Sequence, residues 1–366
     1  MKYSDLIELK KRMEFNMTES EVLVKLVDEA SRKGEKVQKE NKRLRKQAKK
    51  ILQALIKSEE IIFKEDKLLT DYDPLRICTI GIDGSFYLVG GVGGKWYSPY
   101  SIVRVRFEKG IESQPLLDVY SAGIEEIEEQ KTPNVNNEAS LRMLVGETKA
   151  LDNWGAKNIP SIVFIDGPIV DPPTYKDKDY IKDRCSAIKK CLTNSIVIGC
   201  VKRSRDSFFI KHFETIIGSE TLRKDFLSDQ QLFAYIFSIF RLENKYSGIL
   251  FSKFINISDY DVYSIYKENG VYIFTAFYQK NMDSKILRID VPAMDEKLSE
   301  IDTLSLKFIK AAAYWQYPKQ HIPLPIELAH EKCRIREGTA EVLYKEILTK
   351  SRSGDIEDQI TMWQLR

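Results

Sequence analysis

The sequence predicts a mixed α/β fold, in which a mixed sheet is flanked by helices. Apolar β-branched stretches alternate with helical patterns between residues 77 and 202. Two of the predicted strands carry the same Ile-Asp-Gly triplet, at residues 82–84 and 165–167, whereas residues 1–70 have helical patterns. These observations predict an N-terminal helical region over 1–70, an α/β domain over 71–350 and a tail over 351–366.

The N-terminal region is predicted to contain two helices with a strongly basic surface. Thr18 and Glu21 form a capping box, which opens an apolar stripe at helical spacing. A second stripe, over residues 44–55, lies beneath a basic run from 32 to 50 that has ten Lys or Arg against two Glu. The run suits contact with a polyanion such as DNA, and a solvated helix face explains it equally well. The apolar faces suit a contact between helices or between two copies of the chain.

The α/β domain is predicted to begin with an antiparallel meander. Residues 77–94, 96–107 and 115–124 have strand patterns joined by glycine or polar turns. A helix over about Glu138–Trp154, a strand at 161–166, a charged helix over about Lys178–Leu192 and a strand at 195–202 follow. The predicted order is therefore β-β-β-α-β-α-β.

The rest of this domain is predicted to hold a less regular insert, two strands and two helices. The insert covers about residues 205–260 and contains one aromatic-rich helical pattern at 229–243. Strand patterns return at 270–280 and 284–292, and helical patterns at about 300–314 and 328–350. A proline-rich segment, 317–330, links the last two helices.

Several classes of protein are excluded by the composition. No apolar run approaches the roughly 18 residues that a membrane helix needs, so no membrane contact is expected. The first residues contain no apolar signal segment, and the five cysteines lack CxxC spacing, which together predict a cytoplasmic protein with reduced thiols. The glycine cluster at 90–94 is not a phosphate loop, because Val89 and Trp96 occupy positions that need a glycine and a hydroxyl.

Acidic residues at the ends of two predicted strands are the strongest chemical signal. Asp83 and Asp166 each follow a β-branched run and precede a glycine. If their strands are neighbours, two carboxylates meet and repel, and a divalent cation such as Mg²⁺ or Mn²⁺ relieves the repulsion. The alternative is a pair of ordinary Asp-Gly turns. A third carboxylate is expected from the intervening helix, where Glu147 borders the buried face and Glu138, at the helix start, is the fallback.

Two further groups of residues are candidates for the same site. His330 lies on an apolar pattern just after a proline-rich turn, which suits either a packed residue or a metal ligand and acid. Lys202, Arg203 and Arg205 directly follow an apolar strand, where a cationic cluster suits phosphate contacts. A solvated loop explains the cationic cluster equally well.

The order of these motifs resembles the NurA nuclease family. The segments are IGIDGSF, a helix with Arg142 and Glu147, IVFIDGP, VIGCVKRS and PLPIELAH, within residues 76–350. The resemblance implies an RNase H-like core and a Mn²⁺- or Mg²⁺-dependent DNA nuclease with one or two ions. It also implies 5′-to-3′ exonuclease and single-strand endonuclease activity, a homodimer, and a HerA-like hexameric ATPase as partner. DNA end processing in repair and phage defence both suit such a pair.

Individual residues carry the resemblance. It implies that Asp83, Glu147, Asp166 and His330 bind metal, and that Lys202 acts after the strand. One departure concerns a tyrosine-proline pair that the family has eight or nine residues before the histidine. Here Pro323 follows His321 and Ile322 at that point, and the tyrosine-proline pair stands earlier, at residues 317 and 318. Either Tyr317 or His321 therefore fills the family's tyrosine position.

Two other functions stay open on the sequence alone. A DNA-binding or assembly subunit of a DNA translocase with a vestigial site would bind without cleaving. An RNase H-like nuclease acting on RNA or hybrids would share the carboxylates. Sensitivity of cleavage to chelation separates the first from an enzyme, and a substrate panel separates the second.

Overall fold

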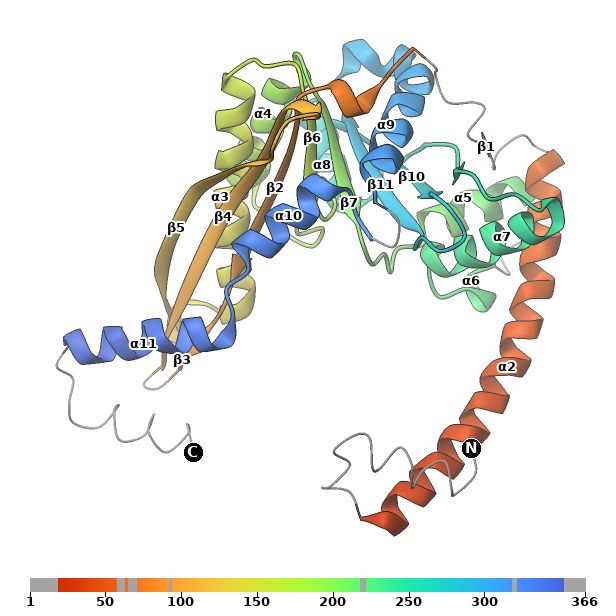
Figure 1. The fold of residues 1–366 in the computed structure, drawn as a ribbon, viewed down its shortest axis with the longest axis horizontal. Helices are drawn as coiled ribbons and strands as arrows, with labels where there is room; N and C mark the ends of the chain where they lie inside the picture. The colour runs from red at the N-terminus through yellow and green to blue at the C-terminus, as the bar shows by residue number, and fades with distance from the viewer. Residues whose placement is uncertain are drawn as a thin grey trace.

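One mixed sheet runs through the molecule and has helices on both faces (Figure 1). The structure is a computed structural model, and it describes residues 19–57, 63–64, 71–91, 94–217, 222–317 and 321–351. Within these residues the sheet comprises eleven strands. They are β1 (Phe63–Lys64), β2 (Thr79–Phe86), β3 (Val89–Gly90), β4 (Lys95–Ile111), β5 (Leu116–Glu128), β6 (Ile162–Asp166), β7 (Ile196–Val201), β8 (Leu250–Phe251), β9 (Ile255–Asn256), β10 (Tyr272–Gln279) and β11 (Leu287–Ala293).

Five of these strands form the RNase H-like core expected from the sequence. β2 pairs antiparallel with β4, and β4 with β5, which confirms the predicted meander. On its other side β2 pairs parallel with β6, and β6 parallel with β7. The antiparallel strands β11 and β10 then extend the sheet beyond β7. The two strands that carry Ile-Asp-Gly, β2 and β6, are therefore direct neighbours.

The two faces of the sheet hold two separate apolar cores. Ile80 and Ile82 of β2 point into the core that α3 (Val135–Ala156) and α4 (Lys178–Leu192) cover. Phe164 of β6 points into the opposite core, beneath α9 (Ile301–Trp315) and α10 (Leu324–Cys333). Because strand side chains alternate between faces, Gly81 and Asp83 lie on the α10 side of β2. This places one candidate ligand directly beneath α10.

The N-terminal region differs from the two predicted helices. It is a single helix, α2 (Ser20–Lys57), because no glycine or proline between the two apolar stripes is strong enough to end it. Its second half packs through Leu44, Ala48 and Leu52 into the core beside α7 (Asp229–Asn244), whereas its first half projects away from the body (Figure 1). The predicted capping residue Thr18 lies outside the described residues.

Two other segments differ from the predictions. The stretch 205–260 is largely helical, with α5 (Phe208–Ile217), α6 (Leu222–Asp225) and α7. The helix predicted over 328–350 is two helices, α10 and α11 (Glu337–Ser351), separated by an extended break at Arg334. α8 (Asp261–Glu268) completes the helices, and none of the described ones is both long and apolar enough to cross a bilayer.

Candidate active site

Asp83 and Asp166 meet on neighbouring strands, as the sequence predicts. Ile82 pairs with Ile165 across the parallel ladder, so the next residue on each strand is an aspartate. The prediction that both end their strands is correct for Asp166 and wrong for Asp83, since β2 continues to Phe86. Asp83 therefore lies in the middle of a strand, where it is 4% exposed.

The glycines after the two aspartates do different work. Gly84 is an extended strand residue, and a Cβ at that position would lie 2.8 Å from Oε1 of Glu147. The absent side chain therefore makes room for the carboxylate of Glu147, which α3 brings against β2. Gly167 has φ +94°, so it forms the actual turn after β6. The turn interpretation thus holds for one triplet only.

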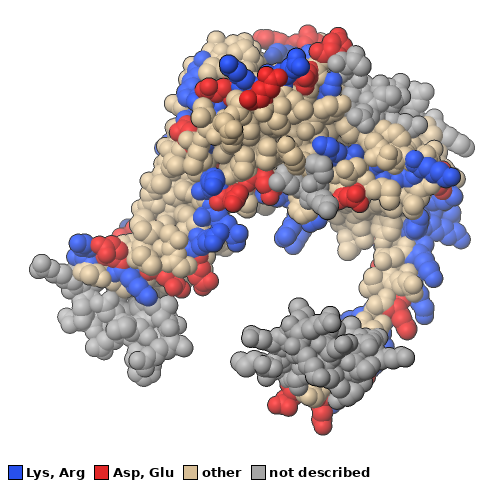
Figure 2. All heavy atoms as spheres, in the orientation of Figure 1, with Lys and Arg blue, Asp and Glu red and all other residues tan. Residues whose placement is uncertain are grey.

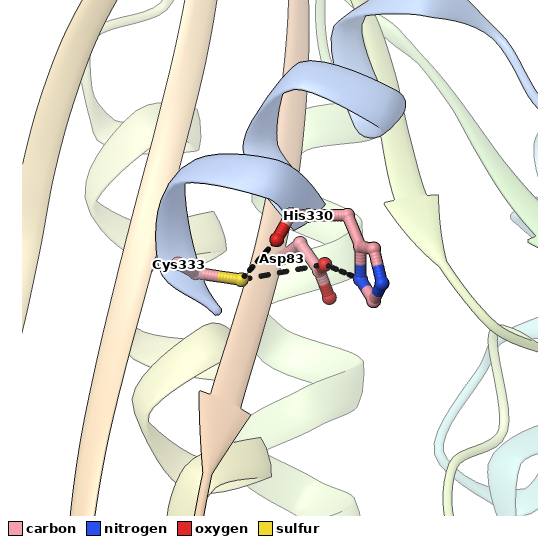
Figure 3. A group of neighbouring side chains, drawn as sticks. All are labelled: Asp83, His330 and Cys333. Carbon is pink, nitrogen blue, oxygen red and sulfur yellow. Dashed lines mark hydrogen bonds and ion pairs between the residues drawn. The ribbon is translucent and has the colours of Figure 1, made fainter. Parts of the chain in front are cut away.

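α10 brings two further side chains over Asp83 (Figure 3). His330 Nδ1 lies 2.7 Å from Oδ2 of Asp83 and 3.6 Å from Oδ2 of Asp166. Cys333, one turn further on, donates its thiol to Oδ2 of Asp83 at 3.5 Å. His330 lies in the last turn of α10, not at a helix start as predicted, because the helix begins at the proline-rich turn and ends at Cys333.

Lys202 reaches the site from the loop that follows β7. Its Nζ donates to Oδ2 of Asp166 at 2.7 Å. Arg203 and Arg205, on the same loop, are exposed. The amide of Gln230, from the start of α7, holds this loop by accepting from the backbone N–H of Ser204 at 2.9 Å and donating to the carbonyl of Lys202 at 3.3 Å.

The carboxylates of the site raise one another's pKa. Burial, followed by the charge of Asp83, raises the pKa of Glu147 well above its usual range. The same two causes raise the pKa of Asp166, against the opposing charge of Lys202. Burial also raises the pKa of Asp171 to about 6, and this fourth carboxylate adds to the field at Glu147. The hydrogen bond to Asp83 raises the pKa of His330.

This donor set fits a divalent cation. Carboxylate oxygens and an imidazole nitrogen are ligands for Mn²⁺, and a cation supplies the positive charge that the crowded carboxylates lack. Among the described residues, the side chains whose ligand atoms all lie within 4.8 Å of one another are Asp83, His330 and Cys333. Asp166 adjoins this group through His330, and Glu147 reaches Asp83 from the α3 side of β2. Their roles as ligands stay predictions.

The remaining candidates lie apart from these contacts. Glu138, the fallback, forms an ion pair with Arg142 one turn along α3. Tyr317 and His321 are both exposed and flank residues outside the described part of the chain. Sequence reasoning missed Asp171, Gln230 and Cys333. Only Cys333 had a detectable signal, since it stands three residues after His330 and so shares its helix face.

Comparison with protein families decides the relationship. The profile of the NurA domain matches residues 52–335, which is most of the chain. The chain belongs to the NurA nuclease family. The match covers β2, α3, β6, β7 and α10, and therefore every element that contributes to the site. It confirms the resemblance drawn from the sequence motifs. Among curated proteins, none matches the chain.

Solved structures similar to this one include NurA proteins. The crystal structure of the NurA nuclease from Sulfolobus solfataricus has a TM-score of 0.55 and 14% identity, and the match covers 93% of this chain and all of that one. This similarity shows a shared fold. A NurA structure bound to dAMP and manganese has a TM-score of 0.41 and 10% identity, covering 80% of this chain and 92% of that one. Endonuclease V from Ciona intestinalis, solved with inosine-containing DNA, has a TM-score of 0.32 and 14% identity, covering 84% and 98%.

Proposed function

We propose that this protein is a divalent-metal-dependent DNA nuclease that hydrolyses phosphodiester bonds. One observation carries the proposal: Asp83, Asp166, His330 and Lys202, from three strands or their ends and one helix, converge within hydrogen-bond distance of a neighbour. Four such groups beside a buried glutamate match what phosphodiester hydrolysis needs, namely a metal site and a phosphate contact. Family membership and the manganese and dAMP of one NurA relative support the same activity.

The residues have distinct proposed roles. Asp83, Asp166 and His330 would hold Mn²⁺ or Mg²⁺, with Glu147 as the additional carboxylate. When bound, the metal activates water and stabilises the charge that develops on the scissile phosphate. Lys202, whose ammonium already neutralises Asp166, is placed to contact a phosphate oxygen.

Two cationic residues and a helix extend the proposed DNA contact. Arg203 and Arg205 stand exposed beside Lys202, so they reach backbone phosphates on either side of the reacting one. Figure 2 shows Lys and Arg side chains along α2, on the limb that projects from the body. A chain of basic side chains from the site loop to this limb would follow the DNA backbone.

The test is cleavage of labelled single-stranded DNA by the purified chain. We expect degradation with Mn²⁺, none with EDTA, and a loss of at least about a hundredfold in Asp83→Asn and Asp166→Asn, since metal activation contributes several kcal/mol. Asp183→Asn, on the exposed face of α4, is the matched control and should retain activity. Full Mn²⁺-dependent activity in either site variant would contradict the assignment.

Substrate and polarity form the finer part of the proposal. We expect 5′-to-3′ exonuclease activity and endonuclease activity on single-stranded DNA, by family resemblance. A panel of end-labelled DNA, RNA and RNA–DNA hybrids tests this, because 5′ and 3′ labels release different products. Preferential cleavage of RNA or hybrids would favour the RNase H-like alternative. Tight binding without cleavage would favour the non-catalytic assembly subunit.

The proposed assembly is a homodimer that works with a HerA-like hexameric ATPase in DNA end processing or phage defence. The exposed apolar side chains of Val22, Leu26 and Val37 on the projecting half of α2 support a contact between two copies. Light scattering should therefore give a dimer mass for the native chain and a lower mass for Leu26→Glu. Co-purification with a HerA-like ATPase, and stimulation of cleavage by it, tests the partner.

A further inference from the structure

We propose that Asp83, His330 and Cys333 form a second binding mode at this site, a mixed oxygen, nitrogen and sulfur site for Zn²⁺ (Figure 3). The three side chains come from the middle of β2 and the last turn of α10, and they point toward one another. Cys333 is 2% exposed, and its thiol donates to Asp83 and to the carbonyl of His330. The thiol is therefore aimed at the carboxylate and not into the apolar core.

The distances already approach a tetrahedral arrangement. Bond lengths of about 2.3 Å to sulfur and about 2.0 Å to oxygen or nitrogen place two tetrahedral ligand atoms about 3.5 Å apart for sulfur and oxygen, and about 3.3 Å apart for nitrogen and oxygen. Sγ of Cys333 lies 3.5 Å from Oδ2 of Asp83, which is the required separation. Nδ1 of His330 lies 2.7 Å from the same oxygen, as a hydrogen bond demands, and must retreat by about 0.6 Å. His330 is 52% exposed, so its ring has the freedom to do so.

Thiolate separates this mode from the proposed catalytic one. Mn²⁺ and Mg²⁺ favour oxygen ligands, whereas thiolate and imidazole favour Zn²⁺ and its larger relative Cd²⁺. Asp83 belongs to both sets, so a soft ion held by Cys333 and the catalytic ion compete for one carboxylate. Zn²⁺ should therefore displace Mn²⁺ and inhibit. That consequence rests on the proposed nuclease function, whereas binding itself does not.

Binding involves only proton release. The S–H bond of Cys333 breaks, a sulfur–metal bond forms, and the thiol proton passes to solvent. The imidazole binds as the neutral ring with its proton on Nε2, so that the Nδ1 lone pair faces the ion. No oxidant or reductant takes part.

The test uses the full-length chain freed of metal and titrated with Cd²⁺, whose bond to thiolate absorbs in the ultraviolet. Cys191→Ser is the matched control, because Cys191 is also a buried helical thiol that donates to a backbone carbonyl. We expect the native chain and Cys191→Ser to show the absorbance at one ion per chain. Cys333→Ser should lose it and bind Cd²⁺ at least about tenfold more weakly, the smallest effect usual for a changed metal environment. Unchanged absorbance in Cys333→Ser overturns the proposal.

A second variant guards against misfolding of Cys333→Ser. His330→Gln changes an exposed side chain, so it should fold normally, and we expect it to weaken Cd²⁺ and Zn²⁺ binding at least about tenfold. Unchanged affinity in this variant also overturns the proposal. Zn²⁺ inhibition of Mn²⁺-dependent cleavage should need Cys333, with each variant compared with its own activity without Zn²⁺. If no variant cleaves DNA, the nuclease proposal fails, and the Cd²⁺ titration still decides this inference.

Discussion

Gly81 determines how closely α10 approaches β2, and Gly81→Ala tests whether that approach creates the site. A Cβ at Gly81 would lie 2.3 Å from the carbonyl carbon and oxygen of Pro325, which are backbone atoms of α10. Ordinary contacts begin near 3.4 Å, so the helix must retreat by about 1.1 Å. His330 moves with it, and its 2.7 Å contact with Asp83 lengthens beyond the range of a hydrogen bond.

The expected result is a large loss of activity with a modest loss of stability. A displacement of about 1 Å costs roughly a hundredfold in rate, and overpacking costs about 1–3 kcal/mol of unfolding free energy. Rates with Mn²⁺ on labelled single-stranded DNA and urea denaturation measure the two effects. Gly155→Ala is the control, since its Cβ would meet the backbone nitrogen of Cys191 at 2.9 Å, between α3 and α4. A Gly81→Ala protein with the native rate would refute the role of α10 in the site.

Three further predictions test the loop, the buried acids and the basic helix. Gln230→Ala should lower kcat/KM about tenfold by freeing the Lys202 loop, and Gln230→Glu, which keeps the acceptor for Ser204, should lose less; equal losses would contradict this. Burial raises the pKa of Asp229 to about 7, so the native state binds a proton that the unfolded state releases near pH 4. Stability should therefore fall by up to about 1.4 kcal/mol per pH unit from pH 4 to 7, and denaturant titrations should show a flatter profile in Asp229→Asn. DNA affinity should fall steeply with salt, and neutralising Lys42 and Arg45 should reduce the slope on single strands by about 0.7 for each phosphate that the helix then leaves unpaired; an unchanged slope would make the basic run a solvated face.

The pairing of Asp83 with Asp166 was predictable from the sequence. Two β-branched runs separated by one helix favour parallel neighbours, and a parallel ladder brings corresponding residues side by side. The triplet marks the same register position on both strands, so the carboxylates had to meet. Lys202 was predictable for a similar reason, because it follows the next parallel strand at the same edge.

The parts that escaped prediction depend on packing between distant segments. Asp-Gly is a common turn pair, so nothing local showed that Gly84 extends β2 to accommodate Glu147. The break at Arg334, which ends α10 just after Cys333, follows from docking and not from a proline or glycine. The contact of Gln230 with Ser204 joins residues from two loops, and no spacing rule relates them.

The metal ligands and the phosphate contact are therefore held by different means, and this makes them separable by mutation. Asp83 and His330 come from a strand and a helix packed through Gly81, so their geometry is as rigid as the core. Lys202 comes from a loop that hydrogen bonds to Gln230 hold in place. Substitutions at the strand–helix contact should consequently act on kcat and on metal affinity together. Substitutions in the loop network should act on DNA affinity while metal affinity stays near that of the native chain.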